Sequence, residues 1–195
     1  MTDKYRKKTI WRRSISKLVH FKQEISGAIA IEFAFAVPLL ITLYLGMVEM
    51  GNAIAADRKV TLLSSTVGDI VAQHDQISKA ELDNIFLATK EIMRPFQADN
   101  SNLRIEVFSI TVDSDDAQIS SWPGKVTNGG TCGNANAAAP AVPSEMLAVS
   151  PSVIVAKVCY KYSSLLNYFF KTDPSFNEVF FIRPRHVDAI EWNKT

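Results

Sequence analysis

Glu32 is the most unusual ionisable residue in the sequence. It is the only charged side chain in residues 28–48. About 20 apolar residues are what a bilayer-spanning helix needs, so this window predicts a membrane span. A carboxylate there costs about 2.5 to 3.5 kcal/mol on insertion scales, and a partner ammonium would reduce that cost. Glu32 could therefore form an ion pair; alternatively it stays protonated or extends to the membrane surface.

Cys132 and Cys159 are the two cysteines of the sequence, and both follow the predicted span. No histidine or further cysteine stands at metal-ligand spacing from them. In an oxidising compartment such a pair predicts a disulfide, which would stabilise the folded domain by roughly 3.5 kcal/mol in the chain-entropy model. The alternative is two unrelated buried thiols.

The signatures of an enzyme are missing from the sequence. His20, His74 and His186 stand far apart, and none has a second histidine four residues away. The sequence lacks a nucleophile elbow, a nucleotide loop and a dinucleotide fingerprint, and its carboxylates are scattered. We therefore predict no catalytic residues, no metal, no cofactor and no enzymatic activity.

Residues 1–26 are strongly basic. They carry eight Lys or Arg residues against Asp3 and Glu24, a net charge of about +6, whereas the whole chain has +1. Basic residues before a span stay on the cytoplasmic side, which predicts a cytoplasmic N-terminus and an external C-terminal part. Only Tyr5 and Trp11 could stack on bases, so we predict no nucleic-acid partner.

Two helices are predicted before residue 95. Beyond the span, apolar residues recur at three- and four-residue steps, so the first helix should continue to about Gln73. Pro38 would kink it. Ser78 and Glu81 form a capping-box pattern, which starts a second, amphipathic helix that ends before Pro95.

Strands are predicted in the C-terminal half, where apolar residues recur at every second position. The alternation begins at Leu103, and residues 118–122 return after a polar turn, which predicts a β-hairpin. Residues 123–151 are predicted to be a long loop, and residues 153–162 the clearest strand. A last strand over residues 179–190 should be interrupted at Pro184. Residues 165–170 form an apolar patch of uncertain form.

These elements predict an α+β fold. It has a long N-terminal membrane-spanning helix, a second amphipathic helix and a small antiparallel β-sheet. The predicted division is a basic leader peptide at 1–27, a transmembrane helix at 28–50, a helical stalk at 51–95 and a periplasmic antiparallel β domain at 96–195.

The region from about residue 20 to residue 60 resembles the precursors of type IV pilins and, in detail, the TadE-like pseudopilins of tight-adherence (Flp/Tad) pilus systems. The resemblance rests on the basic leader ending in Ser26 and Gly27, and on the segments 28–34, 37–40 and 46–51. It implies a pilin-like fold and cleavage after Gly27 by a prepilin peptidase. Ala28 would become the new N-terminus.

Such a cut would give Glu32 a partner. Residues four apart share one face of a helix, so the new ammonium of Ala28 would lie beside the Glu32 carboxylate. The pair could also form between neighbouring subunits, which is the role of this acid in pilin-like families. Phe33, directly after the acid, is part of the same pattern.

An ordinary secretory cut is also conceivable, because Ala53-Ile54-Ala55 is an A-x-A pattern. Against it, the apolar run exceeds the usual 7 to 15 residues. The resemblance implies a minor pseudopilin of the bacterial inner membrane, single-pass, with a periplasmic C-terminal domain. Its expected partners are the prepilin peptidase, other pilin subunits, the assembly machinery and membrane lipid. The alternatives are an unprocessed single-pass envelope protein with an outer protein-binding domain, and a membrane-tethered enzyme.

Overall fold

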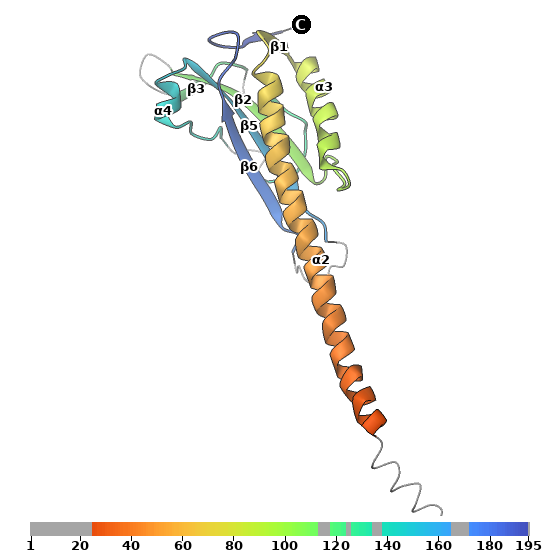
Figure 1. The fold of residues 1–195 in the computed structure, drawn as a ribbon. Helices are drawn as coiled ribbons and strands as arrows, with labels where there is room; N and C mark the ends of the chain where they lie inside the picture. The colour runs from red at the N-terminus through yellow and green to blue at the C-terminus, as the bar shows by residue number, and fades with distance from the viewer. Residues whose placement is uncertain (1–24, 113–117, 124–125, 134–137, 165–171, 195) are drawn as a thin grey trace, which may run out of the picture. The chain divides into compact units, whose positions relative to one another are not determined.

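The structure is a computed structural model of the 195-residue chain. It describes residues 25–112, 118–123, 126–133, 138–164 and 172–194 (Figure 1). The chain forms two compact units, Met1–Val48 and Glu49–Thr195. The leader predicted at residues 1–27 lies almost wholly outside the described residues, and the predicted four-part division stays a prediction.

The longest element is helix α2, Ile25–Val71. It ends two residues before the predicted limit, which is within the usual uncertainty of a helix end. The helix continues through Pro38, whose carbonyl accepts a hydrogen bond from Thr42 Oγ1 at 2.8 Å. A threonine hydroxyl inside a helix commonly bonds the carbonyl four residues back in this way.

Within the second unit, α2 buries one stripe of small and branched residues against the sheet. Their spacing of three and four places them on one face of the helix. The stripe consists of Ala53, Ala56, Val60, Leu63, Val67 and Val71. At Gly68 the helix lies close to β6, since a Cβ there would lie 2.9 Å from Phe180 Cδ1. Figure 1 shows this part of α2 lying along the sheet.

The second helix is α3, Lys79–Thr89, followed by the 3₁₀ helix η1, Lys90–Met93. The predicted capping box forms: the Glu81 backbone N–H donates to Ser78 Oγ, and the Ser78 backbone N–H donates to the Glu81 carboxylate at 2.7 Å. The prediction of an amphipathic helix ending before Pro95 is confirmed. Leu82 and Phe86 of α3 belong to the same core as the α2 stripe.

The main sheet is antiparallel and has five strands. They are β2 Leu103–Val112, β3 Gln118–Ser120, β4 Val126–Thr127, β5 Ser152–Lys161 and β6 Ser175–Ile182. The order is β3-β2-β5-β6, and β4 also pairs with β2. The predicted α+β fold, the hairpin and the strand at 153–162 are confirmed. The predicted turn at 113–116 lies outside the described residues.

The prediction of a last strand over residues 179–190 is wrong for its second half. β6 ends at Ile182, and the chain then turns away from the sheet to form β7, Glu191–Asn193. Pro184 has no N–H for a sheet ladder, and the Arg185 N–H instead donates to Ala72 O at 2.9 Å, beyond the end of α2. β7 pairs in parallel with β1, Gln76–Ser78, in a separate two-stranded sheet.

The predicted loop at 123–151 also holds short regular elements, β4 and helix α4, Ser144–Leu147. Its described part covers the sheet face opposite α2. There Val142 packs with Phe108 and Val155 in a second, smaller core. The Gln118 side chain fixes this cover with two hydrogen bonds of 2.8 Å to the Val142 backbone. The apolar patch predicted at 165–170 lies outside the described residues.

Candidate functional site

The residues predicted to be cut and to pair lie together near the start of α2. Gly27, Ala28, Glu32 and Phe33 are all exposed in the first unit. Because four residues make about one helical turn, Ala28 and Glu32 lie on the same side of α2. A Cβ at Gly27 would meet nothing within 4 Å, so packing within this chain does not require a glycine there.

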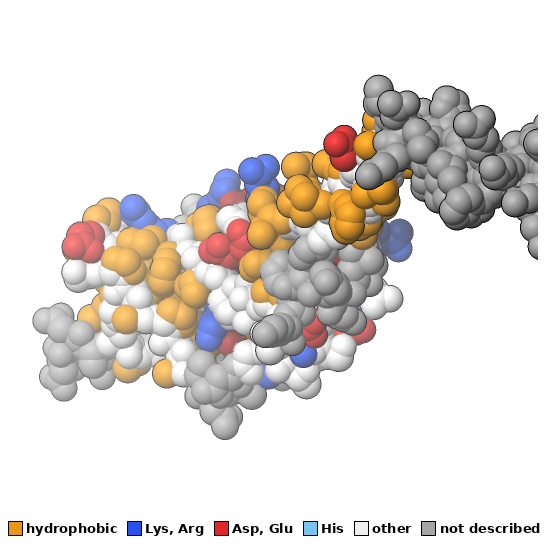
Figure 2. Space-filling model, turned by 90° about the horizontal axis from the view of Figure 1, so that it is seen from below, with side chains coloured by type: hydrophobic (Ala, Val, Ile, Leu, Met, Phe, Trp, Pro, Cys, Tyr) orange, Lys and Arg blue, Asp and Glu red, His pale blue; other side chains and the backbone are white. Residues whose placement is uncertain are grey.

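The same helix presents an unusually apolar surface. The helical stretch Gly27–Val71 is long and apolar enough, by length and composition, to cross a membrane, and none of its most apolar window is buried. Phe35, Tyr44 and Met47 are 78%, 67% and 76% exposed. Figure 2 shows hydrophobic side chains covering the visible face of the helix next to the grey residues. This surface fits a single-pass membrane protein.

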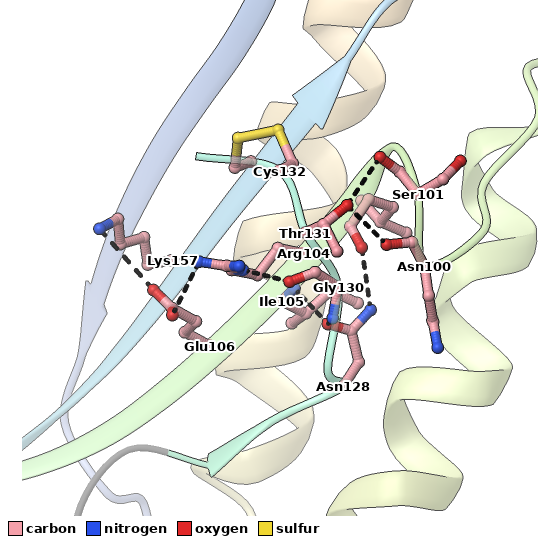
Figure 3. The surroundings of a disulfide bond; sticks show 12 residues. Asn100, Ser101, Arg104, Ile105, Glu106, Asn128, Gly130, Thr131, Cys132 and Lys157 are labelled. Carbon is pink, nitrogen blue, oxygen red and sulfur yellow. Dashed lines mark hydrogen bonds and ion pairs between the residues drawn. A yellow bond between two sulfur atoms is a disulfide. The ribbon is translucent and has the colours of Figure 1, made fainter. Parts of the chain in front are cut away.

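The predicted disulfide joins Cys132 to Cys159, with Cα atoms 5.7 Å apart. Cys159 lies on β5, on the sheet face opposite α2. Cys132 belongs to the segment 128–133, which we call the disulfide strap (Figure 3). The bond uses both cysteines of the sequence and ties the strap to the sheet.

Hydrogen bonds hold the disulfide strap along β2. The Asn128 side chain accepts from the Ile105 N–H at 3.0 Å and donates to Leu103 O at 3.2 Å. A Cβ at Gly130 would lie 1.9 Å from Leu103 O, so only glycine fits at this close approach. The disulfide strap therefore lies along β2 past the end of β4, where a paired strand would otherwise lie.

Three charged side chains lie on the sheet next to the disulfide strap (Figure 3). Arg104 Nε donates to Gly130 O at 2.5 Å, and its Nη1 lies 3.9 Å from Glu106 Oε1. Lys157 Nζ lies 3.7 Å from Glu106 Oε2. Arg104 and Glu106 are almost fully buried, and buried charges persist only where they are paired. This arrangement fixes the strap and is structural in character.

A second interaction that the sequence did not predict joins Glu49 to Tyr162. Glu49 is the first charged residue after the span and is 1% exposed. Its carboxylate accepts a hydrogen bond of 3.1 Å from the Tyr162 hydroxyl. Burial, then the hydrogen bond and the charge of Glu49, raises the pKa of Tyr162 to about 12. The sequence feature that could have indicated this interaction is an acid directly after an apolar run.

The part of the chain that the structure describes holds no cluster of metal-binding side chains. There, no three or more His, Cys, Asp or Glu side chains lie close enough to hold a metal ion. The predicted absence of cofactors and of catalysis stays a prediction.

Comparison with known protein families identifies a similarity over most of α2. The model of the family described as TadE-like protein matches residues 27–67. No curated protein and no solved structure matches the chain. The matched residues include Gly27, Ala28, Glu32 and Phe33, and also Glu49. They cover most of α2, from its first turn to the turn before its last. The resemblance predicted from the sequence is confirmed: residues 27–67 match the TadE-like family.

Proposed function

We propose that the protein is a TadE-like minor pseudopilin, a structural component of a tight-adherence (Flp/Tad) type IV pilus in the bacterial inner membrane. The observation that carries this proposal is the coincidence of the TadE-like match with the exposed apolar helix that bears Gly27, Ala28 and Glu32. A TadE-like domain supports association with a Tad pilus. Other pilus subunits are then the natural partners.

Processing after Gly27 by a prepilin peptidase is the first part of the proposal. Gly27 is exposed, and nothing lies where its Cβ would be. A glycine that packing does not demand supports recognition by another protein. The cut would remove the basic leader and expose the ammonium of Ala28.

Pairing of Glu32 is the second part. An exposed carboxylate on a lipid-facing helix needs a cation, and a freed Ala28 supplies one on the same helical face. In an assembly of copies, the ammonium of a neighbouring subunit could serve equally. Glu32 would then align one subunit against the next.

The topology is the third part. The basic leader favours a cytoplasmic N-terminus, which sends the second unit to the periplasm. The Cys132–Cys159 disulfide supports this assignment, since such bonds persist in oxidising compartments. Membrane lipid and the assembly machinery complete the proposed set of partners.

One observation favours the alternative, an unprocessed single-pass envelope protein. The Gly27–Ala28 bond already lies in the first turn of α2, and a peptidase needs a locally unwound chain. Intact mass of the membrane form separates the two functions. A chain that begins at Ala28 supports the pseudopilin, and Gly27→Leu should then leave the chain uncut. A full-length wild-type chain in cells that contain the peptidase would overturn the processing.

A further inference from the structure

We propose that strand β6 is a docking site for an extended, apolar segment of a partner protein, which would join the main sheet as a further strand. β6 is the last strand in the order β3-β2-β5-β6 (Figure 1). It pairs with β5 over its whole length, from Ser175 to Ile182. Within the described residues no strand pairs with its other edge, which we call the β6 edge.

The backbone of β6 presents a row of hydrogen-bonding groups at this edge. In an antiparallel pair, alternate residues direct their N–H and C=O groups to the partner strand, and the residues between them direct theirs away from it. Apart from the ladder with β5, no backbone–backbone hydrogen bond between described residues involves residues 175–182. Such a row, at the spacing of a strand, is what a further strand satisfies. The β6 edge therefore fits an extended chain.

The side chains of β6 are apolar on both faces of the sheet. On the face that α2 covers, Phe176, Phe180 and Ile182 pack against the main core. On the opposite face, Val179 and Phe181 pack against the smaller core. All five are only partly buried, whereas most of the neighbouring strand β5 is fully buried. A further strand with apolar side chains on both faces would cover them and extend both cores.

β6 lacks the features that keep edge strands unpaired. Such strands are short, carry Lys or Pro, or contain a bulge. β6 has eight residues without Lys, Arg or Pro, and it follows β5 without a bulge. The opposite end of the sheet is different: β3 has only three residues, and β4 and the disulfide strap lie along the rest of β2. This contrast between the two ends indicates that β6 is kept available for pairing.

The charge of β6 favours a different chain as its partner over a second copy. Glu178 is the one charged residue of β6, and its carboxylate accepts a hydrogen bond of 3.1 Å from Thr61 Oγ1 on α2. Two β6 strands paired about a two-fold axis would bring the two Glu178 side chains opposite or diagonal to each other on one face. Like charges at such positions are unfavourable. The segment that fits is therefore apolar on both faces and has no acid at its centre.

Binding of a synthetic strand to the full chain in detergent micelles tests the proposal. The probe is a labelled peptide with the sequence of residues 153–160 and Cys159→Ser, because β6 already accepts this strand on its inner edge. Two further peptides carry N-methyl groups on alternate amides, one on the odd-numbered and one on the even-numbered residues. Strand addition uses the amides of only one of these sets.

Fluorescence anisotropy compares the three peptides. We expect one methylated peptide to bind like the parent and the other to bind about tenfold more weakly, the equivalent of one or two lost hydrogen bonds. Apolar adsorption to the chain or to the micelle does not distinguish the two methylated peptides. Equal binding of both would therefore overturn the proposal.

Hydrogen exchange and two variants assign the binding to β6. Alternate amides of β6 should exchange about tenfold more slowly with the peptide present, and those of β3 should not change. Asn177→Lys, at an exposed position of β6, adds the charge that natural edge strands use and should weaken binding severalfold. Val149→Lys, at a 67% exposed apolar position outside the sheet, is the control and should leave binding intact. Protection outside β6, or equal affinities of the two variants, contradicts the site.

Pairing of β6 with a second copy of this chain is the competing outcome, and native mass spectrometry in micelles identifies it. A monomer that takes up one peptide supports the proposal. A dimer that the peptide dissociates would show that β6 pairs with itself and would overturn it. These measurements need neither processing after Gly27 nor pili, so failure of the pilus role leaves strand docking standing, and failure of strand docking leaves the pilus role standing.

Discussion

The Tyr162 hydroxyl donates a hydrogen bond to the Glu49 carboxylate across 113 positions of the sequence. Glu49 directly follows the apolar run, and Tyr162 directly follows β5, so the bond joins the entry of α2 into the folded unit to the end of a central strand. Phe96 and Phe176 pack against the same tyrosine ring. The bond therefore fixes the point at which the chain enters its second unit.

Removing the hydroxyl should destabilise the second unit. A hydrogen bond to a charged group contributes about 1.5 to 3 kcal/mol, so we expect Tyr162→Phe to lower the free energy of unfolding by about that amount. Urea unfolding of the full chain in detergent, followed by tryptophan fluorescence, to which buried Trp122 contributes, measures it. Tyr160→Phe is the matched control, since its hydroxyl bonds a neutral carbonyl and should cost less. Equal losses in the two variants would contradict the role of Glu49.

Stability should fall at alkaline pH. Burial and the Glu49 hydrogen bond raise the pKa of Tyr162 to about 12, from an ordinary value of about 10. The folded state thus holds this proton more tightly than the unfolded state. The contribution is complete below pH 10 and is lost as the pH rises to about 12. Urea midpoints across this window should fall less in Tyr162→Phe than in the wild type, and identical slopes would refute the assignment.

The Glu32 carboxylate should matter for assembly and not for the cut. Glu32→Ala leaves Gly27 and Ala28 unchanged, so the mature chain should still appear on immunoblots. Surface pili, sheared from cells and weighed against the wild type, should fall strongly because the ammonium loses its partner. Glu32→Asp keeps the charge and should retain part of the yield. Normal piliation of Glu32→Ala would rule out the pairing.

Gly130→Ala should damage the disulfide strap. Its Cβ would lie 1.9 Å from the Leu103 carbonyl oxygen, a backbone atom that cannot rotate away. Overpacking of this kind costs about 1 to 3 kcal/mol, which urea unfolding would detect. Gly51→Ala is the control, because its Cβ meets nothing within 4 Å, and alanine in a helix gains about 0.5 to 1 kcal/mol. Wild-type stability of Gly130→Ala would show that the strap does not approach β2 so closely.

Local patterns predicted the fold wherever the signal lies within a few residues. The alternation in β2 and β5 and the capping box at Ser78 are of this kind, and each forms as predicted. The parallel pairing of β1 with β7 was not predictable, because it joins Gln76 to Glu191 through strands of three residues. A strand of three residues is too short to show the alternation of apolar and polar residues that predicts a strand.

The same distinction applies to the candidate site. Gly27, Ala28 and Glu32 could be named from the sequence because one helix turn separates them. The prediction of the disulfide needed only the count of cysteines. By contrast, nothing near Glu49 in the sequence indicates Tyr162, and nothing near Gly130 indicates Leu103, since long-range packing alone brings these residues together.

Reduction of the Cys132–Cys159 bond should lower the stability of the second unit by about 3.5 kcal/mol, because the unfolded chain regains the freedom of a closed loop. Asn128 should hold the disulfide strap in place afterwards, through its bonds to Leu103 and Ile105. We therefore expect the reduced chain to stay folded and Asn128→Ala to unfold it more readily after reduction than before. Urea midpoints with and without reductant measure both effects, and electrophoresis with and without reductant confirms the bond. Equal effects of Asn128→Ala in the two redox states would show that the disulfide and the Asn128 bonds hold the strap independently.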